Sequence, residues 1–270
     1  LYLCKRSRPD FQTVVSYLTT RVTKSDVDDW KKLGRAIKYL RAEKHRWLTL
    51  EVGDDLCIKW WVDASFAVHP DMRSHTGATM SLGKGSPISF SRKQKINTKS
   101  STEAELVGVD DAMSLIVWTR NFLERQGLTV TDNVVFQDNQ SSILLETNGR
   151  SSSGRRTRHI DIRYFFVADR VQNGELRIQY CPTEDMNGDF FTKPLQGSKF
   201  RRFRQTVLNS PPDADLYNQS ASQECVGKRS YADVVRRGVP INERNPNHIK
   251  LKRIRKNAAS PITKMQSAVS

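Results

Sequence analysis

The order of strand-like and helix-like patterns between residues 55 and 208 constrains the fold more than any other feature of the sequence. Three strand-like stretches come first, and a long helical stretch follows that begins at the capping pair Ser100 and Glu103 and ends before Gly127. A strand, two helices, a fifth strand and a terminal helix come next. The succession predicts an α/β fold with a mixed five-stranded sheet and flanking helices. The expected strands are 57–62, 76–82, 87–91, 134–137 and 176–180, with a turn at 83–86, and the internal helices are 100–125, 140–146 and 160–171.

The first fifty residues have a helical character of their own. Apolar residues recur at helical spacing between residues 27 and 40, behind the capping candidate Ser25 with Asp28 three positions later. Residues 11–18 form a shorter candidate helix that we expect to pack on the longer one. The sequence therefore predicts a small helical segment over 1–50 before an α/β domain over 55–208.

Positive charge is concentrated at the C-terminal end. The chain has 44 Lys and Arg against 29 Asp and Glu, a formal charge of +15, yet residues 197–270 alone hold 15 basic and 5 acidic residues. This basicity favours a polyanionic partner such as nucleic acid. We expect the tail over 209–270, with Pro211-Pro212 and little periodicity, to be mostly disordered. Its run 250–256 fits nucleic-acid binding, nuclear localisation or unselected read-through, and the sequence does not separate these.

Several classes of protein are disfavoured by what the sequence does not contain. The four cysteines stand far apart without a C-x-x-C pair, which argues against a zinc knuckle or a disulfide framework. No apolar run approaches the ~18 residues that a membrane crossing needs. We therefore expect no membrane partner, no small-molecule cofactor and an intracellular location, in a cytoplasmic particle or the nucleus.

Four acidic residues stand where such a sheet would bring them together. Asp63 ends the first strand, Glu105 lies in the first turns of the long helix, Asp138 ends the fourth strand and Asp189 opens the helix after the fifth. Strand ends and the first turns of neighbouring helices converge on one crevice in open α/β sheets. Carboxylates gathered there repel one another unless cations bind. Two Mg²⁺ or Mn²⁺ ions ~3.5–4 Å apart would suit these oxygens and catalyse phosphodiester hydrolysis without a covalent intermediate.

Five short segments stand out as motifs: Trp61–Ser65, Lys99–Leu106, Gln137–Gln140, Arg158–Tyr164 and Asp189–Leu195. In this order they resemble consecutive signatures of the ribonuclease H region of copia-type retrotransposon Pol polyproteins. The resemblance covers roughly residues 57–208, and residues 1–44 resemble the segment that joins the family's reverse transcriptase to that region. It implies a ribonuclease H-like fold, an Asp-Glu-Asp-Asp site at the four acids, an RNA–DNA hybrid as substrate and the reverse transcriptase portion of the same polyprotein as partner.

The acidic residues also have ordinary structural interpretations. Glu103 competes with Glu105 as the helix ligand, although Glu103 already has a role in the helix cap. An Asp that follows a strand often serves as a turn former, which is the alternative for Asp63. The alternative for Asp138 is a helix cap. Asp185 competes with Asp189, four residues later in the chain.

Other polar residues resemble functional residues, but we assign them structural or solvent-exposed roles. His159 precedes the penultimate helix, away from the loop where many ribonucleases H carry a mobile histidine, so we assign it a structural or capping role. We expect His75 to be solvated in a loop. Val27-Asp28-Asp29 resembles the paired aspartates of a polymerase, but acidic residues are favoured in the first turn of a helix, and we assign no polymerase site.

A basic stretch leads directly into the helix that carries Glu105. Because a hybrid is recognised through its shape and its 2′-hydroxyl groups, we expect contacts to the nucleic-acid backbone rather than to bases. The loop 150–158 is a second candidate, and solvated loops are the alternative for both. The candidate contacts are Arg73, Arg92, Lys93, Lys95, Asn97 and Lys99.

Three functions fit this pattern to different degrees. The leading one is a metal-dependent endoribonuclease that cuts the RNA strand of RNA–DNA hybrids. The alternative is a catalytically inactive, nucleic-acid-binding remnant of a decayed retroelement. An integrase of related fold is disfavoured, since its acids run Asp, Asp, Glu whereas Glu105 comes second in this chain.

Overall fold

A computed structural model describes residues 1–148 and 161–210. The predicted loop 150–158, His159 and the basic run 250–256 lie outside the described residues. Within the described ranges, no helix combines the length and apolar character that crossing a membrane requires.

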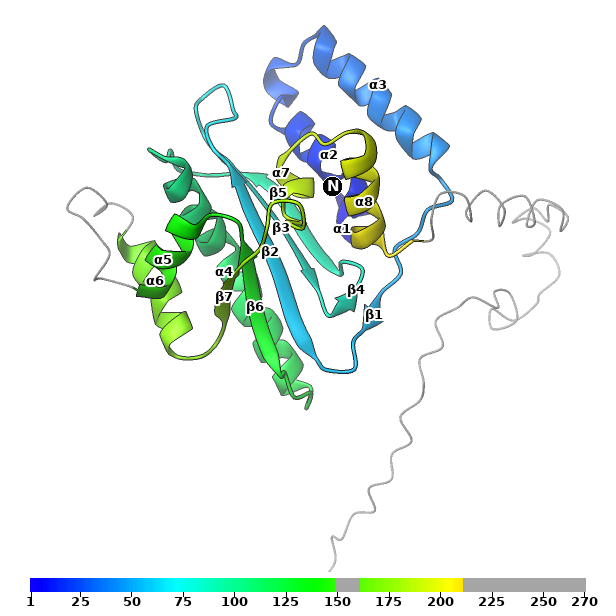
Figure 1. Ribbon diagram of the computed structural model, residues 1–270. Helices are drawn as coiled ribbons and strands as arrows, with labels where there is room; N and C mark the ends of the chain where they lie inside the picture. Colours follow the sequence, from blue (N-terminus) through cyan, green and yellow to red (C-terminus); the bar gives the residue numbers. More distant parts are fainter. Residues whose placement is uncertain (149–160, 211–270) are drawn as a thin grey trace, which may run out of the picture. The chain divides into compact units, whose positions relative to one another are not determined.

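The centre of the molecule is a five-stranded sheet in the order β5-β3-β2-β6-β7 (Figure 1). In chain order, the first three strands of this sheet pair antiparallel, whereas the last two run parallel to β2. This arrangement confirms the mixed five-stranded sheet that the sequence predicts. The strands are β2 (Cys57–Ser65), β3 (His75–Ser81), β5 (Ile88–Lys93), β6 (Asp132–Gln137) and β7 (Arg177–Tyr180).

A second, two-stranded sheet was not predicted. β1 (Glu51–Val52) pairs antiparallel with β4 (Gly83–Lys84), within the stretch that we expected to form only a turn. A side chain at Gly83 would approach the backbone oxygen of Glu51 to 2.5 Å, so glycine permits this close pairing.

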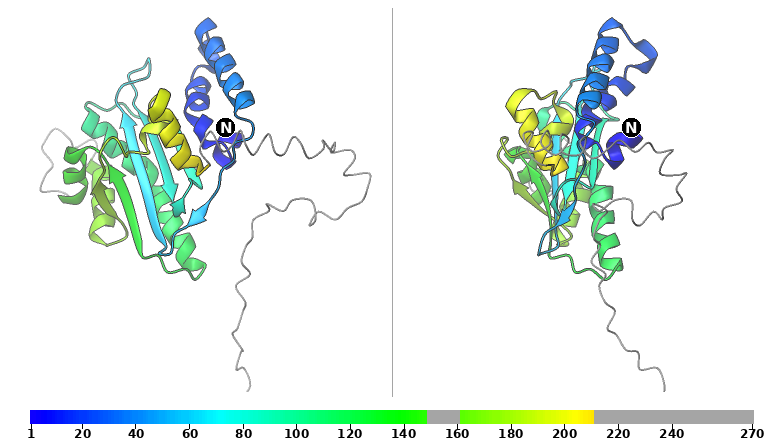
Figure 2. Two further views of the ribbon diagram at one scale, coloured as in Figure 1. Left: turned by 45° about the vertical axis from the view of Figure 1, so that its right-hand side comes forward. Right: turned by 90° about the vertical axis from the view of Figure 1, so that its right-hand side faces the viewer.

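Helices cover both faces of the central sheet, and Figure 2 shows α4 and α8 on opposite sides of it. Every residue of β3 is buried, because α4 packs against one face of the strand and α7 against the other. On the α4 side, Trp60 and Val62 of β2 form a core with Met113 and Ile116. These helices are α4 (Ser101–Arg125), α5 (Gln140–Asn148), α6 (Asp161–Gln172), α7 (Asp189–Thr192) and α8 (Gly197–Leu208).

The N-terminal segment packs against the edge of the sheet. Helix α2 contacts α3 as expected, but its polar side chains bond to β5. The Gln12 amide donates to the Ser89 carbonyl (3.2 Å) and accepts from the Ser89 hydroxyl (2.7 Å), and the Ser16 hydroxyl donates to the Ser91 carbonyl (2.5 Å). The elements here are α1 (Tyr2–Arg6), η1 (Pro9–Phe11), α2 (Gln12–Thr19), η2 (Val22–Lys24) and α3 (Val27–Ala42).

Helix α3 departs from the prediction in two respects. Its cap is Asp26 paired with Asp29, one residue later than the predicted pair. Its predicted apolar face is largely exposed, with Trp30 74% and Val27 70% accessible. Asp29 is buried and bonds to Arg21 (3.0 Å), in agreement with a structural role for the aspartates of this first turn.

Candidate active site

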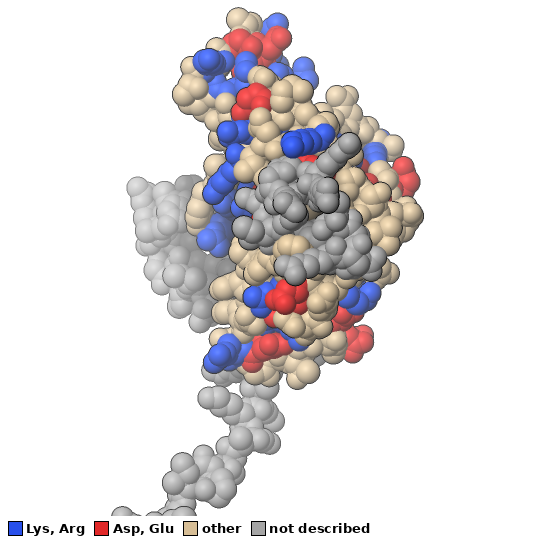
Figure 3. All heavy atoms as spheres, turned by 90° about the vertical axis from the view of Figure 1, so that its left-hand side faces the viewer, with Lys and Arg blue, Asp and Glu red and all other residues tan. Residues whose placement is uncertain are grey.

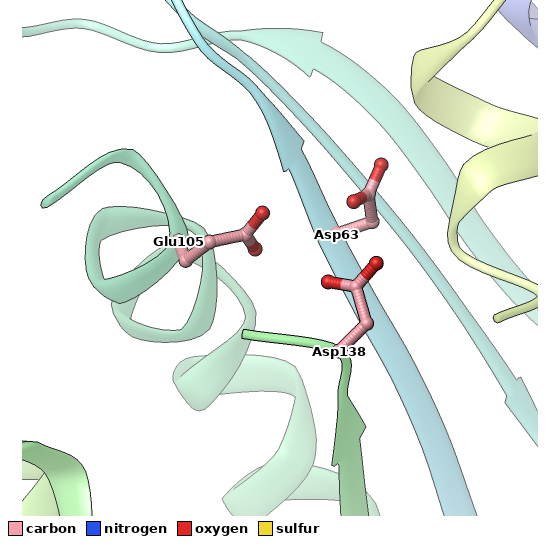
Figure 4. A group of neighbouring side chains, drawn as sticks. All are labelled: Asp63, Glu105 and Asp138. Atoms are coloured by element: carbon pink, nitrogen blue, oxygen red, sulfur yellow. The ribbon is translucent and has the colours of Figure 1, made fainter. Parts of the chain in front are cut away.

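Three of the four predicted acids come together at one end of the parallel strands. Asp63 from β2, Asp138 after β6 and Glu105 from α4 point toward one another (Figure 4). One carboxylate oxygen from each lies within 4.8 Å of the other two. The predicted convergence of strand ends and an early helix turn is therefore found for these three residues.

Local structure explains each position. Asp63 lies inside β2, which extends to Ser65, and not at the end of a shorter strand as predicted. Asp138 directly follows β6, and the helix cap that was its alternative role is filled by Asn139, whose side chain accepts from the backbone amides of Ser141 and Ser142 (3.1 and 3.2 Å).

The helix cap gives the two glutamates of α4 different surroundings. The backbone amide of Glu103 donates to the Ser100 hydroxyl (3.2 Å), and the Glu103 carboxylate accepts from the Lys99 amide (2.7 Å). Glu103 is thus engaged at the start of the helix, whereas Glu105 joins Asp63 and Asp138.

Burial makes this group of carboxylates electrostatically costly. Asp63 is 1% and Glu105 6% exposed. Burial raises the pKa of Asp63 to about 6, although the charge of Lys193 acts in the opposite direction. Burial, followed by the charges of Asp63 and Asp138, raises the pKa of Glu105 well above its ordinary value. A bound cation would reverse both effects, because it favours the ionised carboxylates.

One oxygen in the group has an unmet bonding capacity. Glu105 Oε2 is buried and has no hydrogen-bond partner among the described residues, whereas Asp138 Oδ2 accepts from the Thr183 hydroxyl (3.1 Å). A buried carboxylate oxygen without a partner is unfavourable unless a ligand satisfies it. Three converging carboxylates with a free buried oxygen fit a hard divalent cation such as Mg²⁺ or Mn²⁺.

Asp189 lies beside Asp63 but outside the three-carboxylate group. It is 1% exposed and bonds to the ammonium groups of Lys193 and Lys199, the latter at 3.3 Å. Its competitor Asp185 is exposed and pairs with Arg202 (3.6 Å). The structure thus places Asp189 near the site, and its role as a metal ligand stays a prediction.

Sequence comparison identifies relatives of the chain. It is 32% identical over 211 residues to the retrovirus-related Pol polyprotein from transposon RE2 of Arabidopsis thaliana, and 28% identical over 208 residues to that from transposon TNT 1-94 of Nicotiana tabacum. This chain is related to a segment of copia-type Pol polyproteins. The two alignments cover 76% and 77% of this chain but only 14% and 15% of the polyproteins. No protein-family model matches it.

Structural comparison finds similarity between this chain and solved ribonuclease H structures. LC11-RNase H1 in complex with an RNA/DNA hybrid aligns over 50% of this chain and 92% of its own, with a TM-score of 0.38 and 14% identity. The N-terminal RNase H domain of rv2228c from Mycobacterium tuberculosis, fused to maltose binding protein, aligns over 57% and 99%, with a TM-score of 0.35 and 12% identity.

The six residues that we predict to contact nucleic acid fall into two groups. Three are engaged in ion pairs: Lys93 and Arg73 with Asp71 (2.6 and 3.4 Å), and Arg92 with Asp111 (3.9 Å). The other three, Lys95, Asn97 and Lys99, are exposed on the stretch that leads into α4. Figure 3 shows Lys and Arg side chains gathered in a band on one face of the described part of the molecule.

The expectation that His75 is solvated is wrong. His75 begins β3 and is 4% exposed, since β5 and the loop that carries His69 enclose it. Its ring bonds to His69 (3.0 Å) and to the Ser91 hydroxyl (2.7 Å). Burial and the neighbouring His69 lower the pKa of His75 to about 4, so it is a neutral structural residue near pH 7.

Sequence reasoning missed several residues around the carboxylates. Thr192 donates a hydrogen bond to Asp63, and Lys193 pairs with both Asp63 and Asp189. Glu146 is fully buried on α5, and its charge contributes to the raised pKa of Glu105. Lys193 stands four residues after Asp189 in a helix-forming stretch. This spacing is typical of an ion pair, so this contact could have been predicted from the sequence.

Proposed function

We propose that this chain is a metal-dependent endoribonuclease that hydrolyses the RNA strand of RNA–DNA hybrids during retrotransposon reverse transcription. The observation that carries the proposal is the group Asp63, Glu105 and Asp138, with one buried oxygen of Glu105 unpartnered among the described residues. The relationship to transposon Pol polyproteins supports the choice of substrate, because reverse transcription produces such hybrids. The reverse transcriptase portion of the same polyprotein is the proposed partner.

The chain's own residues would hold the ions and the substrate. Asp63, Glu105 and Asp138 supply the hard oxygen ligands, and Asp189 is the candidate fourth. Two divalent cations held by these carboxylates would activate a water molecule and stabilise the departing oxygen at phosphorus. Asp138 is half-buried, so the phosphodiester would approach the group from its side. The exposed side chains of Lys95, Asn97 and Lys99 would contact the sugar-phosphate backbone without reading sequence.

The test is cleavage of a labelled RNA–DNA hybrid by the purified chain with Mg²⁺, with Mn²⁺ and with a chelator. Single-stranded RNA and duplex DNA serve as control substrates. We expect metal-dependent cutting that is confined to the RNA strand of the hybrid. Binding without cutting in either metal would instead support the inactive, nucleic-acid-binding remnant.

A pair of variants ties the activity to the site. Asp138→Asn should abolish cleavage without unfolding the protein, because it removes one ligand charge and relieves carboxylate repulsion. Asp185→Asn is the matched control, since Asp185 is an exposed aspartate of the neighbouring loop and should leave the cleavage rate unchanged. Equal loss in both variants, or unfolding of the first, would contradict the assignment.

A further inference from the structure

The ammonium group of Lys193 lies between two of the predicted metal ligands. Its Nζ is 3.6 Å from Asp63 Oδ1 and hydrogen-bonds to Asp189 Oδ1. The other oxygen of Asp63 accepts from the Thr192 hydroxyl, and the other oxygen of Asp189 faces Lys199 Nζ at 3.3 Å. Lys193 is therefore a cation that the chain itself supplies to the Asp63–Asp189 pair.

Close backbone packing fixes this position. A side chain at Gly77 would approach Phe191 of α7 to 2.7 Å, and one at Gly188 would approach the Cβ of Asp63 to 2.9 Å. These two glycines let α7 lie directly on β2 and β3, so the residue after the helix, Lys193, stands next to Asp63. The backbone position of Lys193 is therefore fixed by the fold.

The two carboxylates and the ammonium differ in their freedom to move. Asp63 and Asp189 have side chains 2% and 1% exposed, whereas the Lys193 side chain is 38% exposed. The acids are held in place, but the lysine can swing toward solvent without disturbing the core. Lys199, 32% exposed, pairs with Asp189 from the first turn of α8.

We propose that Lys193 is a built-in counter-cation, and that a divalent cation binding between Asp63 and Asp189 must first displace its ammonium group. The inference rests on the proposed function, since it concerns the second ion of that site. It assigns unequal affinities to the two ions: the first binds at Asp63, Glu105 and Asp138, and the second competes with Lys193. Lys193 thereby sets the divalent concentration at which the site is fully occupied.

The test is calorimetric titration of the protein with Mn²⁺ alone, in the absence of nucleic acid. Lys193→Gln should raise the affinity of the weaker Mn²⁺ by about tenfold or more, because a positive charge in contact with both ligands is removed. Lys193→Arg keeps the charge and should bind like the wild type. Arg202→Gln is the matched neutral control, because it removes an exposed charge of α8 that pairs with Asp185, and it should change the weaker affinity by less than about threefold.

The outcomes separate this inference from the proposed function. Two-step Mn²⁺ binding with equal weaker affinities in wild type and Lys193→Gln would overturn the role of Lys193 while leaving the nuclease proposal intact. Absence of Mn²⁺ binding from both proteins would overturn both. Lys193→Met provides a second neutral variant if Lys193→Gln does not fold, as judged by circular dichroism, and the same affinity gain is required of it.

Discussion

Glu146 is a buried acid of α5 whose ionisation would cost stability near the site. Its side chain is fully buried and accepts a hydrogen bond from the Ser142 hydroxyl (2.9 Å). With its amide nitrogen oriented toward this carboxyl, Gln137 donates to both oxygens (3.3 and 2.8 Å). Burial raises the pKa of Glu146 to about 8, so the carboxyl is largely neutral in the folded protein near pH 7.

The raised pKa of Glu146 predicts a pH-dependent effect of Glu146→Gln. Between pH 4.5 and about 8 the folded state holds this proton more tightly than the unfolded state, so its contribution to stability is lost as pH rises. The variant cannot titrate. The difference in unfolding free energy should therefore shift in favour of Glu146→Gln by about 1.4 kcal/mol per pH unit across this window.

Urea unfolding of both proteins between pH 5 and 9 measures this difference, and other titrating groups cancel in the comparison. Glu184→Gln, at an exposed glutamate, is the control for the substitution itself. A difference for Glu146→Gln that does not change with pH would show that Glu146 is already ionised in the folded protein.

At the residue scale, the sequence predicts site residues whose positions follow from the order of strands and helices. It does not predict site residues whose positions depend on how side chains of different elements pack. Asp63, Glu105 and Asp138 were found because strand ends and an early helix turn converge by topology alone. Burial of Glu146 depends on how α5 packs against its neighbours, which no periodicity reveals. The engagement of Asp189 by Lys193 and Lys199 depends on the close approach of α7 to the sheet.

Among the elements, α7 is the one whose position most directly shapes the site. Gly77→Ala would bring a methyl group against the backbone of Phe191, so α7 must shift away from β3. We expect a loss of roughly 1–3 kcal/mol in unfolding free energy from overpacking. Because Lys193 follows α7, the weaker Mn²⁺ affinity should change in the same variant.

Urea denaturation and Mn²⁺ titration measure the two effects of Gly77→Ala. Gly34→Ala is the matched control, since a side chain at Gly34 on α3 would meet nothing within 4 Å. It should raise stability by about 1 kcal/mol through helix propensity. Unchanged stability in Gly77→Ala would mean that α7 does not lie against β3 in solution.

Helix α2 and strand β5 are joined by a reciprocal pair of hydrogen bonds. Gln12→Ala would leave the Ser89 hydroxyl and carbonyl buried without these partners. We expect a loss of roughly 1–3 kcal/mol in unfolding free energy. Thr20→Ala, at an exposed residue after the same helix, should cost far less, and thermal or urea unfolding compares the two variants. Equal stability would place α2 away from β5.

Element order was predictable from the sequence, whereas contacts between elements were not. Alternating and helical periodicities located the five strands and the main helices, with Asp63 two residues from the end of a strand that proved longer than expected. Hydrophobic periodicity predicts that one face of a helix is apolar, but it does not predict which element packs against that face. For this reason neither the exposure of Trp30 on α3 nor the bonds from α2 to β5 were predicted.

For the molecule as a whole, the uneven charge distribution has a testable consequence. Residues 211–270 hold 11 Lys and Arg against 5 Asp and Glu. If these residues bind nucleic acid, a chain ending at Ser210 should bind the hybrid with a shallower dependence on salt. The log–log slope should fall by about 0.9 for each phosphate that residues 211–270 neutralise in the full chain. Fluorescence anisotropy at several salt concentrations measures the slope.

Hybrid cleavage by the same truncated chain provides the control. The carboxylate group lies within residues 63–138, so metal-dependent cutting should persist at saturating hybrid. An unchanged salt slope would show that residues 211–270 make no contribution to binding.

The bonds from Gln12 and Ser16 to the carbonyls of Ser89 and Ser91 also concern the protein's solubility. A sheet's outer strand presents unpaired main-chain groups that can recruit a strand from another molecule. Helix α2 covers part of the outer edge of β5, so a strand from a neighbouring molecule cannot pair with that part of the edge while α2 stays docked. Removing the first twenty residues would expose a six-residue strand as a template for edge-to-edge aggregation.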